Sequence, residues 1–175
     1  MILRKGDTVI ILRFIRLFFS AFLFLLLTGI SGAANGQGSA ASAPQDAALG
    51  RWRLSPGLSR FLSPKDHVTS MTRTYERDGD KIKETWSGSG PGGKSLSGFY
   101  SAKCDGTQEQ SGDVQVTCTR VSHRRVDGEI IFSRDPDHRY YTRQVMPDNK
   151  MMKIIWYKDA ERKKWTEVLV FNRAG

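Results

Sequence analysis

Residues 88–95, GSGPGGKS, match the phosphate-binding loop pattern G-x-x-x-x-G-K-[ST] at every required position. A nucleotide-binding loop of this kind follows a buried strand and opens a helix, whose N-terminal N–H groups help to hold the phosphates. Here residues 95–101 alternate as a strand does, and residues 81–84 are too polar for the central strand of a parallel sheet. We therefore predict that residues 88–95 form the turn of a β-hairpin, with Lys94 as the solvent-facing start of its second strand.

Turn-forming residues recur on both sides of this hairpin, as in Asp78-Gly79, Asp127-Gly128 and residues 147–149. Short runs rich in Val, Ile, Thr, Tyr, Phe and Trp lie between these turns, and no long window keeps helical periodicity. We expect nine strands, near residues 50–54, 67–77, 81–87, 94–104, 113–121, 123–133, 138–146, 150–158 and 164–172. The sequence therefore predicts an all-β fold, an antiparallel up-and-down meander closed into an eight- to nine-stranded barrel.

The first 34 residues have the order of a cleaved secretory signal peptide. A basic start precedes the apolar run from Leu17 to Leu27, which is interrupted only by Ser20, and small residues follow up to a cleavage site after Ala34. The apolar run is too short to cross the ~30 Å core of a bilayer as a helix. We expect a periplasmic or extracellular mature protein without a transmembrane span; an uncleaved membrane anchor is the alternative.

Residues 35–48, NGQGSAASAPQDAA, contain no aromatic side chain and too little apolar surface to offset the entropy of ordering. We expect a flexible linker here, with the folded domain over residues 49–175. The whole chain carries a net charge of +9. A positive charge of this size is compatible with weak association with anionic envelope surfaces, but it specifies no partner.

Cys104 and Cys118 are the only cysteines of the chain. An even number behind a signal peptide suggests a disulfide, and strand alternation places both on the apolar face of neighbouring strands. Two buried thiols that never meet are the alternative. The histidines, His67, His123 and His138, stand apart from the cysteines, so we predict no metal site.

Residues 50–52, GRW, carry a G-x-W motif at the start of the first expected strand. Residues 75–79 then supply a Tyr and a D-G turn, and residues 100–106 read Y-x-A-K-x-D-G. In the order and spacing of these pieces the chain resembles the lipocalin-like (calycin) superfamily. More closely, it resembles a group of small secreted bacterial lipocalin-like proteins of poorly defined function. The resemblance covers residues 50–172 and implies a lipocalin-like barrel domain.

The resemblance also implies a structural role for Trp52, which would pack across one end of the barrel against an Arg near the last strand. Arg173 is the candidate for that Arg. The second lipocalin motif, T-D-Y, has no match in this chain. Transport of a known lipocalin ligand is therefore not implied.

Aromatic and amphipathic side chains are the candidates for a ligand-binding interior. We expect six of them to meet inside the barrel: Trp86, Tyr100, Phe132, Tyr140, Trp156 and Phe171. Thr142 and Gln144, which share the strand face of Tyr140, would add polar groups. A barrel of eight strands is either filled by its side chains or holds one small ligand, and both remain open.

The sequence predicts a secreted or periplasmic lipocalin-like barrel that binds a small apolar or amphipathic ligand, without catalysis and without a cofactor. No G-x-S-x-G nucleophile motif is present, and Glu84, Glu129 and Glu167 fall on different strands. The alternative is a binding or inhibitor module that recognises a protein or an anionic envelope polymer through its loops and basic rim, such as residues 123–125 and 162–165. Export argues against nucleic acid as the partner.

Overall fold

The computed structural model describes residues 45–63 and 67–175. The predicted signal peptide and residues 35–44 of the predicted linker lie outside the described residues, so both stay predictions. Within the described part of the chain, no helix has the length and apolar character needed to cross a membrane.

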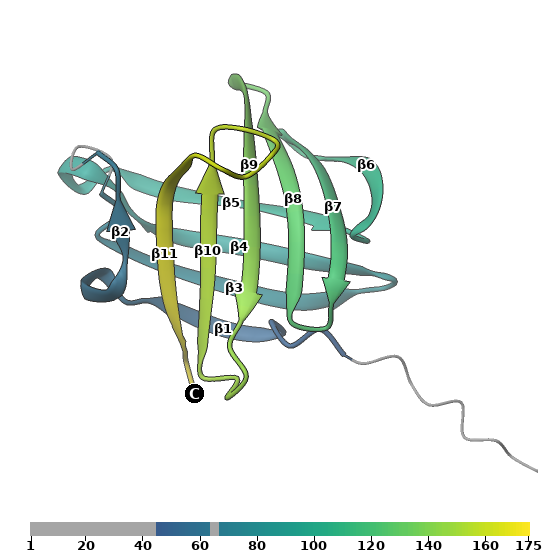
Figure 1. Cartoon of the computed structure of the whole chain (residues 1–175), viewed down its shortest axis with the longest axis horizontal. Helices are drawn as coiled ribbons and strands as arrows, with labels where there is room; N and C mark the ends of the chain where they lie inside the picture. The colour runs from purple at the N-terminus through teal and green to yellow at the C-terminus, as the bar shows by residue number, and fades with distance from the viewer. Residues whose placement is uncertain (1–44, 64–66) are drawn as a thin grey trace, which may run out of the picture. The chain divides into compact units, whose positions relative to one another are not determined.

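Eleven strands of the described chain form one antiparallel sheet (Figure 1). They are β1 (Gly50–Leu54), β2 (Arg60–Phe61), β3 (Ser70–Asp78), β4 (Lys81–Ser89), β5 (Ser95–Ala102), β6 (Asp105–Ser111), β7 (Val114–Ser122), β8 (Arg125–Phe132), β9 (Asp135–Val145), β10 (Met151–Tyr157) and β11 (Trp165–Arg173). Two 3-10 turns accompany them, η1 (Pro56–Leu58) and η3 (Pro91–Gly93).

The strand order is β5-β4-β3-β1-β11-β10-β9-β8-β7-β6. The short β2 pairs with Glu167 and Val168 in the first half of β11. Apart from β1, which joins β3 to β11, the order follows the chain as a meander. Figure 1 shows β3, β4 and β5 crossing behind β7 to β11, so that the sheet folds back on itself. The prediction of an all-β antiparallel meander is confirmed.

The two ends of the sheet, β5 and β6, are consecutive in sequence and nearly close the barrel. No backbone ladder between them is found in the described strands. Side chains bridge the gap instead, because Ser111 Oγ accepts from the N–H of Ser101 at 3.0 Å and Glu109 Oε1 accepts from the N–H of Lys103 at 2.9 Å. Glu109 also forms an ion pair with Lys81.

The strand count exceeds the expected eight to nine because two strands carry weak signals. Residues 105–111, DGTQEQS, form β6 although they have no buried face. Asp105-Gly106 at the start of this strand and Ser111-Gly112 at its end are both typical of turns. β2 contains only two residues. Strand alternation finds strands that bury one face, and neither of these does.

The stretch at 88–95 connects β4 to β5, and Ser89 pairs with Ser95 across the hairpin. Gly92 and Gly93 have φ values of 63° and 78°, in the region that glycine adopts without steric strain. A strand follows the loop where a phosphate-binding loop needs a helix. Lys94 is exposed and directly precedes β5.

Lys94→Ala provides a test of the hairpin interpretation. We expect the wild-type protein to show no Mg²⁺-dependent ATP binding in isothermal titration calorimetry, and the variant to change the free energy of unfolding by less than about 0.5 kcal/mol. Tight ATP binding that is lost in Lys94→Ala would instead establish a nucleotide site at this loop.

Residues 46–48 are part of the folded barrel, although composition places them in the linker. Asp46 and Ala48 are buried. The N–H of Ala47 donates to the carbonyl of His123 at 2.8 Å, which ties this segment to the β7–β8 turn. A short stretch without large apolar residues gives no sequence signal of packing, because it is held by hydrogen bonds, by the ion pairs of Asp46 with Arg143 and Arg120, and by small alanine side chains.

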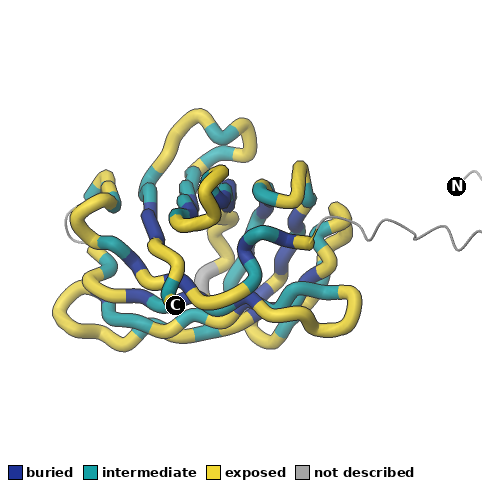
Figure 2. The backbone as a smooth tube through the Cα atoms, turned by 90° about the horizontal axis from the view of Figure 1, so that it is seen from below, coloured by how far each residue is buried: buried dark blue, intermediate teal, exposed yellow. Residues whose placement is uncertain are grey.

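The buried residues lie along the strands, and the connections are mainly exposed (Figure 2). The largest fully buried ones are Trp52, Tyr75, Phe171, Met152, Ile154 and Leu169. Met152 pairs with Phe171 and Ile154 with Leu169, so β10 and β11 supply much of this core at matched register.

Candidate functional site

The barrel contains a cavity of about 1360 Å³, mouth included. At the mouth, the segments that join β4 to β5 and β10 to β11 contribute Lys94 and Lys158 to the lining, and the first part of β9 contributes His138. The larger apolar side chains of the wall are Met71, Trp86, Leu96, Ile130, Phe132, Trp156 and Leu169. An apolar ligand body therefore has both room and matching surface inside the barrel.

Two glycines leave space for aromatic rings, one of which, Trp86, belongs to the cavity wall. Trp86 on β4 lies opposite Arg73 on β3 and Gly98 on β5, so all three share the inner face. A Cβ at Gly98 would collide with the Trp86 ring, and a Cβ at Gly128 would collide with the ring of Tyr141. The close approach of ring to backbone at these positions requires glycine.

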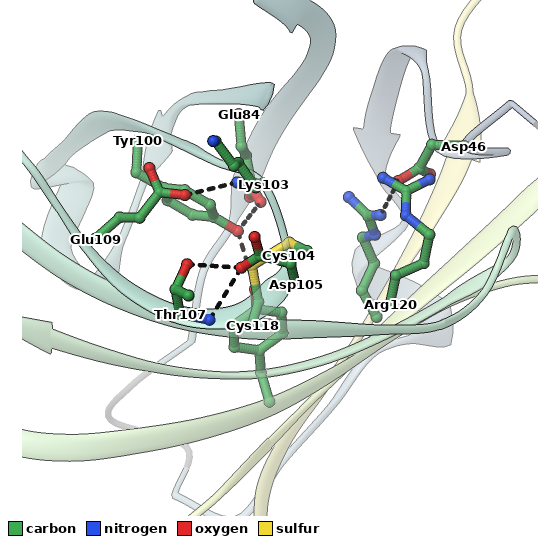
Figure 3. The surroundings of a disulfide bond; sticks show 12 residues. Asp46, Glu84, Tyr100, Lys103, Cys104, Asp105, Thr107, Glu109, Cys118 and Arg120 are labelled. Carbon is green, nitrogen blue, oxygen red and sulfur yellow. Dashed lines mark hydrogen bonds and ion pairs between the residues drawn. A yellow bond between two sulfur atoms is a disulfide. The ribbon is translucent and has the colours of Figure 1, made fainter. Parts of the chain in front are cut away.

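Arg73 and Tyr100 line the inner end of the cavity and form its polar floor. Their exposed fractions are 7% and 5%, and Glu84, which does not line the cavity, is 2% exposed. Arg73 Nη1 forms an ion pair with Glu84 Oε1. The Tyr100 hydroxyl donates to Glu84 Oε2 at 2.6 Å, a contact drawn in Figure 3. The hydroxyl of Tyr141 lies 3.2 Å from that of Tyr100. One carboxylate thus orients the charged and the phenolic group of the floor.

The floor has fixed protonation states at neutral pH. Burial, followed by the charge of Glu84, raises the pKa of Tyr100 well above its ordinary value and that of Tyr141 to about 12. Burial alone lowers the pKa of Arg73, but the charge of Glu84 and its hydrogen bond outweigh it and the pKa rises overall. The phenols therefore stay neutral and the guanidinium stays charged.

A second buried ion pair lies beyond the floor. Arg143 Nη2 donates to Asp46 Oδ2 at 2.7 Å, and the Arg143 guanidinium lies 4.7 Å from the centre of the Tyr75 ring. Arg120, one-third exposed, approaches the same Asp46 oxygen at 3.4 Å (Figure 3). Among the described residues, the two buried arginines, Arg73 and Arg143, are each matched by one buried carboxylate.

Sequence reasoning missed this polar interior. Arg73 stands between Met71 and Tyr75 at alternate positions of one strand, and both neighbours are buried. That alternation was the available signal, since a charged residue between two inward apolar ones must also face inward. Glu84 was considered only as a possible catalytic carboxylate.

The structure brings five of the six predicted interior aromatic residues to the cavity lining: Trp86, Tyr100, Phe132, Tyr140 and Trp156. Phe171 is fully buried and does not line the cavity; its ring centre lies 5.7 Å from the Arg73 guanidinium. Tyr140 reaches the lining from β9, close to the mouth. That these residues contact a ligand stays a prediction.

The predicted face of β9 was wrong for Thr142 and Gln144. These two pair with Ile155 and Lys153 of β10 on the outer face, and Tyr140 pairs with Tyr157. The inner face carries the alternate residues, of which Tyr141 lies with its ring centre 5.4 Å from that of Trp156. Two adjacent tyrosines give no indication of which one points inward.

Trp52 and Arg173 lie together at the end opposite the mouth. The Arg173 guanidinium lies 4.2 Å from the centre of the Trp52 ring, and Trp52 Nε1 donates to the carbonyl of Ala48 at 2.6 Å. Arg173 donates to the carbonyls of Ala47 and Leu49, both at 2.8 Å. The N-terminal segment is thereby fastened across this end, which leaves the mouth as the open side of the cavity.

Cys104 and Cys118 form a disulfide, with an S–S distance of 2.09 Å (Figure 3). The bond links the β5–β6 connection to β7, next to the gap in the sheet. In the chain-entropy model a disulfide closing a loop of this length stabilises the fold by about 3 kcal/mol.

Other candidate chemical groups are dispersed. In residues 45–63 and 67–175, no three His, Cys, Asp or Glu side chains group closely enough to hold a metal ion. His67 packs on Phe61 at a ring-centre distance of 4.5 Å, and His138 pairs with Glu129 near the mouth. These histidines therefore have separate surroundings.

No protein-family model and no curated protein sequence matches the chain. Among solved structures, secretory abundant heat soluble protein 4 from Ramazzottius varieornatus is similar, with a TM-score of 0.54 and 14% identity over 74% of this chain and 96% of that chain. As-p18, an extracellular fatty acid binding protein, has a TM-score of 0.49 and 10% identity over 75% of this chain and 99% of that chain. The narrower resemblance to small bacterial proteins stays a prediction. The fold is a nearly closed, lipocalin-like antiparallel barrel, and the likeness to the Ramazzottius protein extends to that fold alone.

Proposed function

We propose that this protein is a non-catalytic carrier that binds one small amphipathic molecule inside its barrel. The single observation that supports the proposal is the cavity of about 1360 Å³, which combines an apolar wall with a buried polar floor. Ligand sites in proteins have this composition: mostly apolar surface with a few placed polar groups that fix orientation. The apolar part of the ligand would contact the wall, and its polar end would reach Arg73 and Tyr100.

The compartment proposed for the carrier is the periplasm or the extracellular space. The sequence order of residues 1–34 and the Cys104–Cys118 disulfide both support export, because structural disulfides persist in oxidising compartments. Binding of a poorly soluble molecule is a role that suits an exported barrel with one open end.

A second candidate function is recognition of an anionic surface by the rim of the barrel. Leu62 and Trp165 are 62% and 40% exposed, and the N–H of Leu62 donates to the carbonyl of Thr166, so the two apolar side chains occupy one region. Lys163 and Lys164 stand beside Trp165 in the chain. Exposed apolar and basic groups together favour contact with an anionic polymer or headgroup layer.

Ile130→Trp tests the carrier proposal, because Ile130 lines the cavity and a larger side chain would occupy ligand space. We expect this variant to weaken binding of a pyrene-labelled long-chain alcohol by about tenfold or more, measured by probe fluorescence. Ile131→Trp is the matched control and should leave probe binding unchanged. Ile131 is the next residue of β8 and faces outward, where it pairs with the exposed Gln115 of β7.

Native mass spectrometry of protein purified from its own source complements this test by revealing any retained ligand. If the probe binds both Trp variants equally well, its site lies outside the cavity and the carrier proposal fails. The carrier proposal also fails if the wild-type protein binds no apolar probe and retains no ligand.

A further inference from the structure

We propose that the cavity floor selects a neutral, hydroxyl-bearing head group over a free carboxylate, so that the ligand class is a long-chain alcohol or an ester of a polyol. This inference rests on the proposed carrier function and specifies its ligand. Three features of the floor support it: its charge balance, the free hydrogen-bonding capacity of its groups, and their burial.

The charge of the floor is already balanced before a ligand enters. The positive charge of Arg73 is matched by Glu84, with which it forms an ion pair. The next buried cation, Arg143, is matched by Asp46 at 2.7 Å. A ligand carboxylate would therefore bring an extra negative charge next to the buried Glu84, and two like charges in a water-poor site disfavour each other strongly.

The floor offers both a hydrogen-bond donor and an acceptor. Tyr100 uses its single hydrogen on Glu84 Oε2, so the Tyr141 hydroxyl at 3.2 Å can only donate to the Tyr100 oxygen, which keeps one lone pair to offer and no proton. Arg73 presents several N–H groups, and its Nε has no hydrogen-bond partner in the described part of the protein. A hydroxyl group can accept from the guanidinium and donate to the phenol oxygen, whereas a carboxylate can only accept.

Burial makes this complementarity selective. Arg73 and Tyr100 are more than nine-tenths buried, and Glu84 behind them is 2% exposed and does not line the cavity. Polar groups in such a site discriminate strongly, because an unpaired buried donor or acceptor is penalised more than a satisfied one is rewarded. The ester carbonyl of a polyol ester would add a further acceptor without adding charge.

The selectivity is tested with two ligands of equal chain length, dodecanol and dodecanoate, each displacing a bound pyrene-labelled alcohol at neutral pH. In the wild-type protein we expect dodecanol to bind about tenfold or more tightly than dodecanoate. In Glu84→Gln the negative charge is removed at constant size, and we expect the ratio to fall by about tenfold or more, since Arg73 then lacks its counter-charge. Glu76→Gln, on the exposed outer face of β3, should leave the ratio unchanged.

Tyr100→Phe gives a second measurement that does not depend on the folding of Glu84→Gln. It removes the acceptor oxygen, so dodecanol should bind more weakly while the affinity for dodecyl methyl ether, which has no hydroxyl proton to donate, should change little. Near-ultraviolet circular dichroism verifies that each variant keeps its packed core.

The possible failures are distinguishable. If dodecanoate binds the wild-type protein as tightly as dodecanol, or if the ratio is the same in Glu84→Gln and the wild type, the head-group inference is wrong and the carrier proposal survives. If neither ligand binds and the labelled alcohol is not retained, the carrier proposal and the inference both fail.

Discussion

Asp46→Ala is expected to lower the free energy of unfolding by about 3–5 kcal/mol, because it leaves the buried Arg143 without its counter-charge. The side chains of Arg143 and Asp46 are 6% and 4% exposed. Asp46 also accepts a hydrogen bond from the N–H of Ala48 at 2.9 Å, which holds the segment in place. Arg120, at 3.4 Å from the same carboxylate, is partly exposed and can turn to solvent when Asp46 is removed.

Urea denaturation measured by tryptophan fluorescence gives the size of this loss. Asp113→Ala is the matched control, since Asp113 lies in the exposed β7 hairpin turn and its substitution should change the free energy of unfolding by less than about 0.5 kcal/mol. The double variant Asp46→Ala/Arg143→Met removes both charges, so it should lose less stability than Asp46→Ala alone.

The result also decides where the folded part of the chain begins. A mature chain that starts at Leu49 should lose as much stability as Asp46→Ala, because it lacks the same carboxylate. If Asp46→Ala is as stable as Asp113→Ala, residues 46–48 are not held against the barrel in solution, and the domain begins at residue 49 as composition predicts.

The sequence predicted the hairpins of this fold well because strand alternation and turn residues are local. Cys118 illustrates this, since alternation predicted its place on the buried face of β7. Cys104 was expected on a neighbouring strand, but it lies in the connection between β5 and β6. The closure of the sheet by pairing of β1 with β11 was not readable in this way, because Trp52 and Arg173 are far apart in the chain. Only the resemblance to lipocalin-like proteins connected them.

The candidate site was less predictable than the fold for a physical reason. Sequence interpretation places charged residues outside, since burying an unpaired charge is strongly unfavourable. Arg73 and Glu84 escape this rule as a pair, and a pair is visible only when the register of β3 and β4 is known. The inward face of β9 likewise contains a charged residue, Arg143, two positions from Tyr141, and its partner Asp46 is not on a neighbouring strand.

Trp52→Ala is expected to lower the free energy of unfolding by about 3–5 kcal/mol, the range measured for truncating large buried aromatic residues. Trp52 is fully buried, and its ring is covered by Arg173 at 4.2 Å. Its removal leaves a void and also leaves the carbonyl of Ala48 without its donor. Because Trp52 pairs with Arg73 across β1 and β3, the void opens directly beside the cavity floor.

Three further variants separate the contributions of Trp52 in the same denaturation experiment. Trp52→Phe keeps a ring but removes the Nε1–H group, so it should lose about 1–3 kcal/mol, less than the alanine variant. Trp165→Ala controls for the loss of a tryptophan at a site that is 40% exposed, and we expect it to lose less than about 1 kcal/mol. Arg173→Ala removes the group that covers the ring. Its loss of stability should be larger than that of Trp165→Ala and smaller than that of Trp52→Ala.

Equal losses in Trp52→Ala and Trp165→Ala would mean that the closed end is not packed as described. In that case the cavity would be open at both ends, because Trp52 and Arg173 are the side chains that fasten residues 47–49 across it.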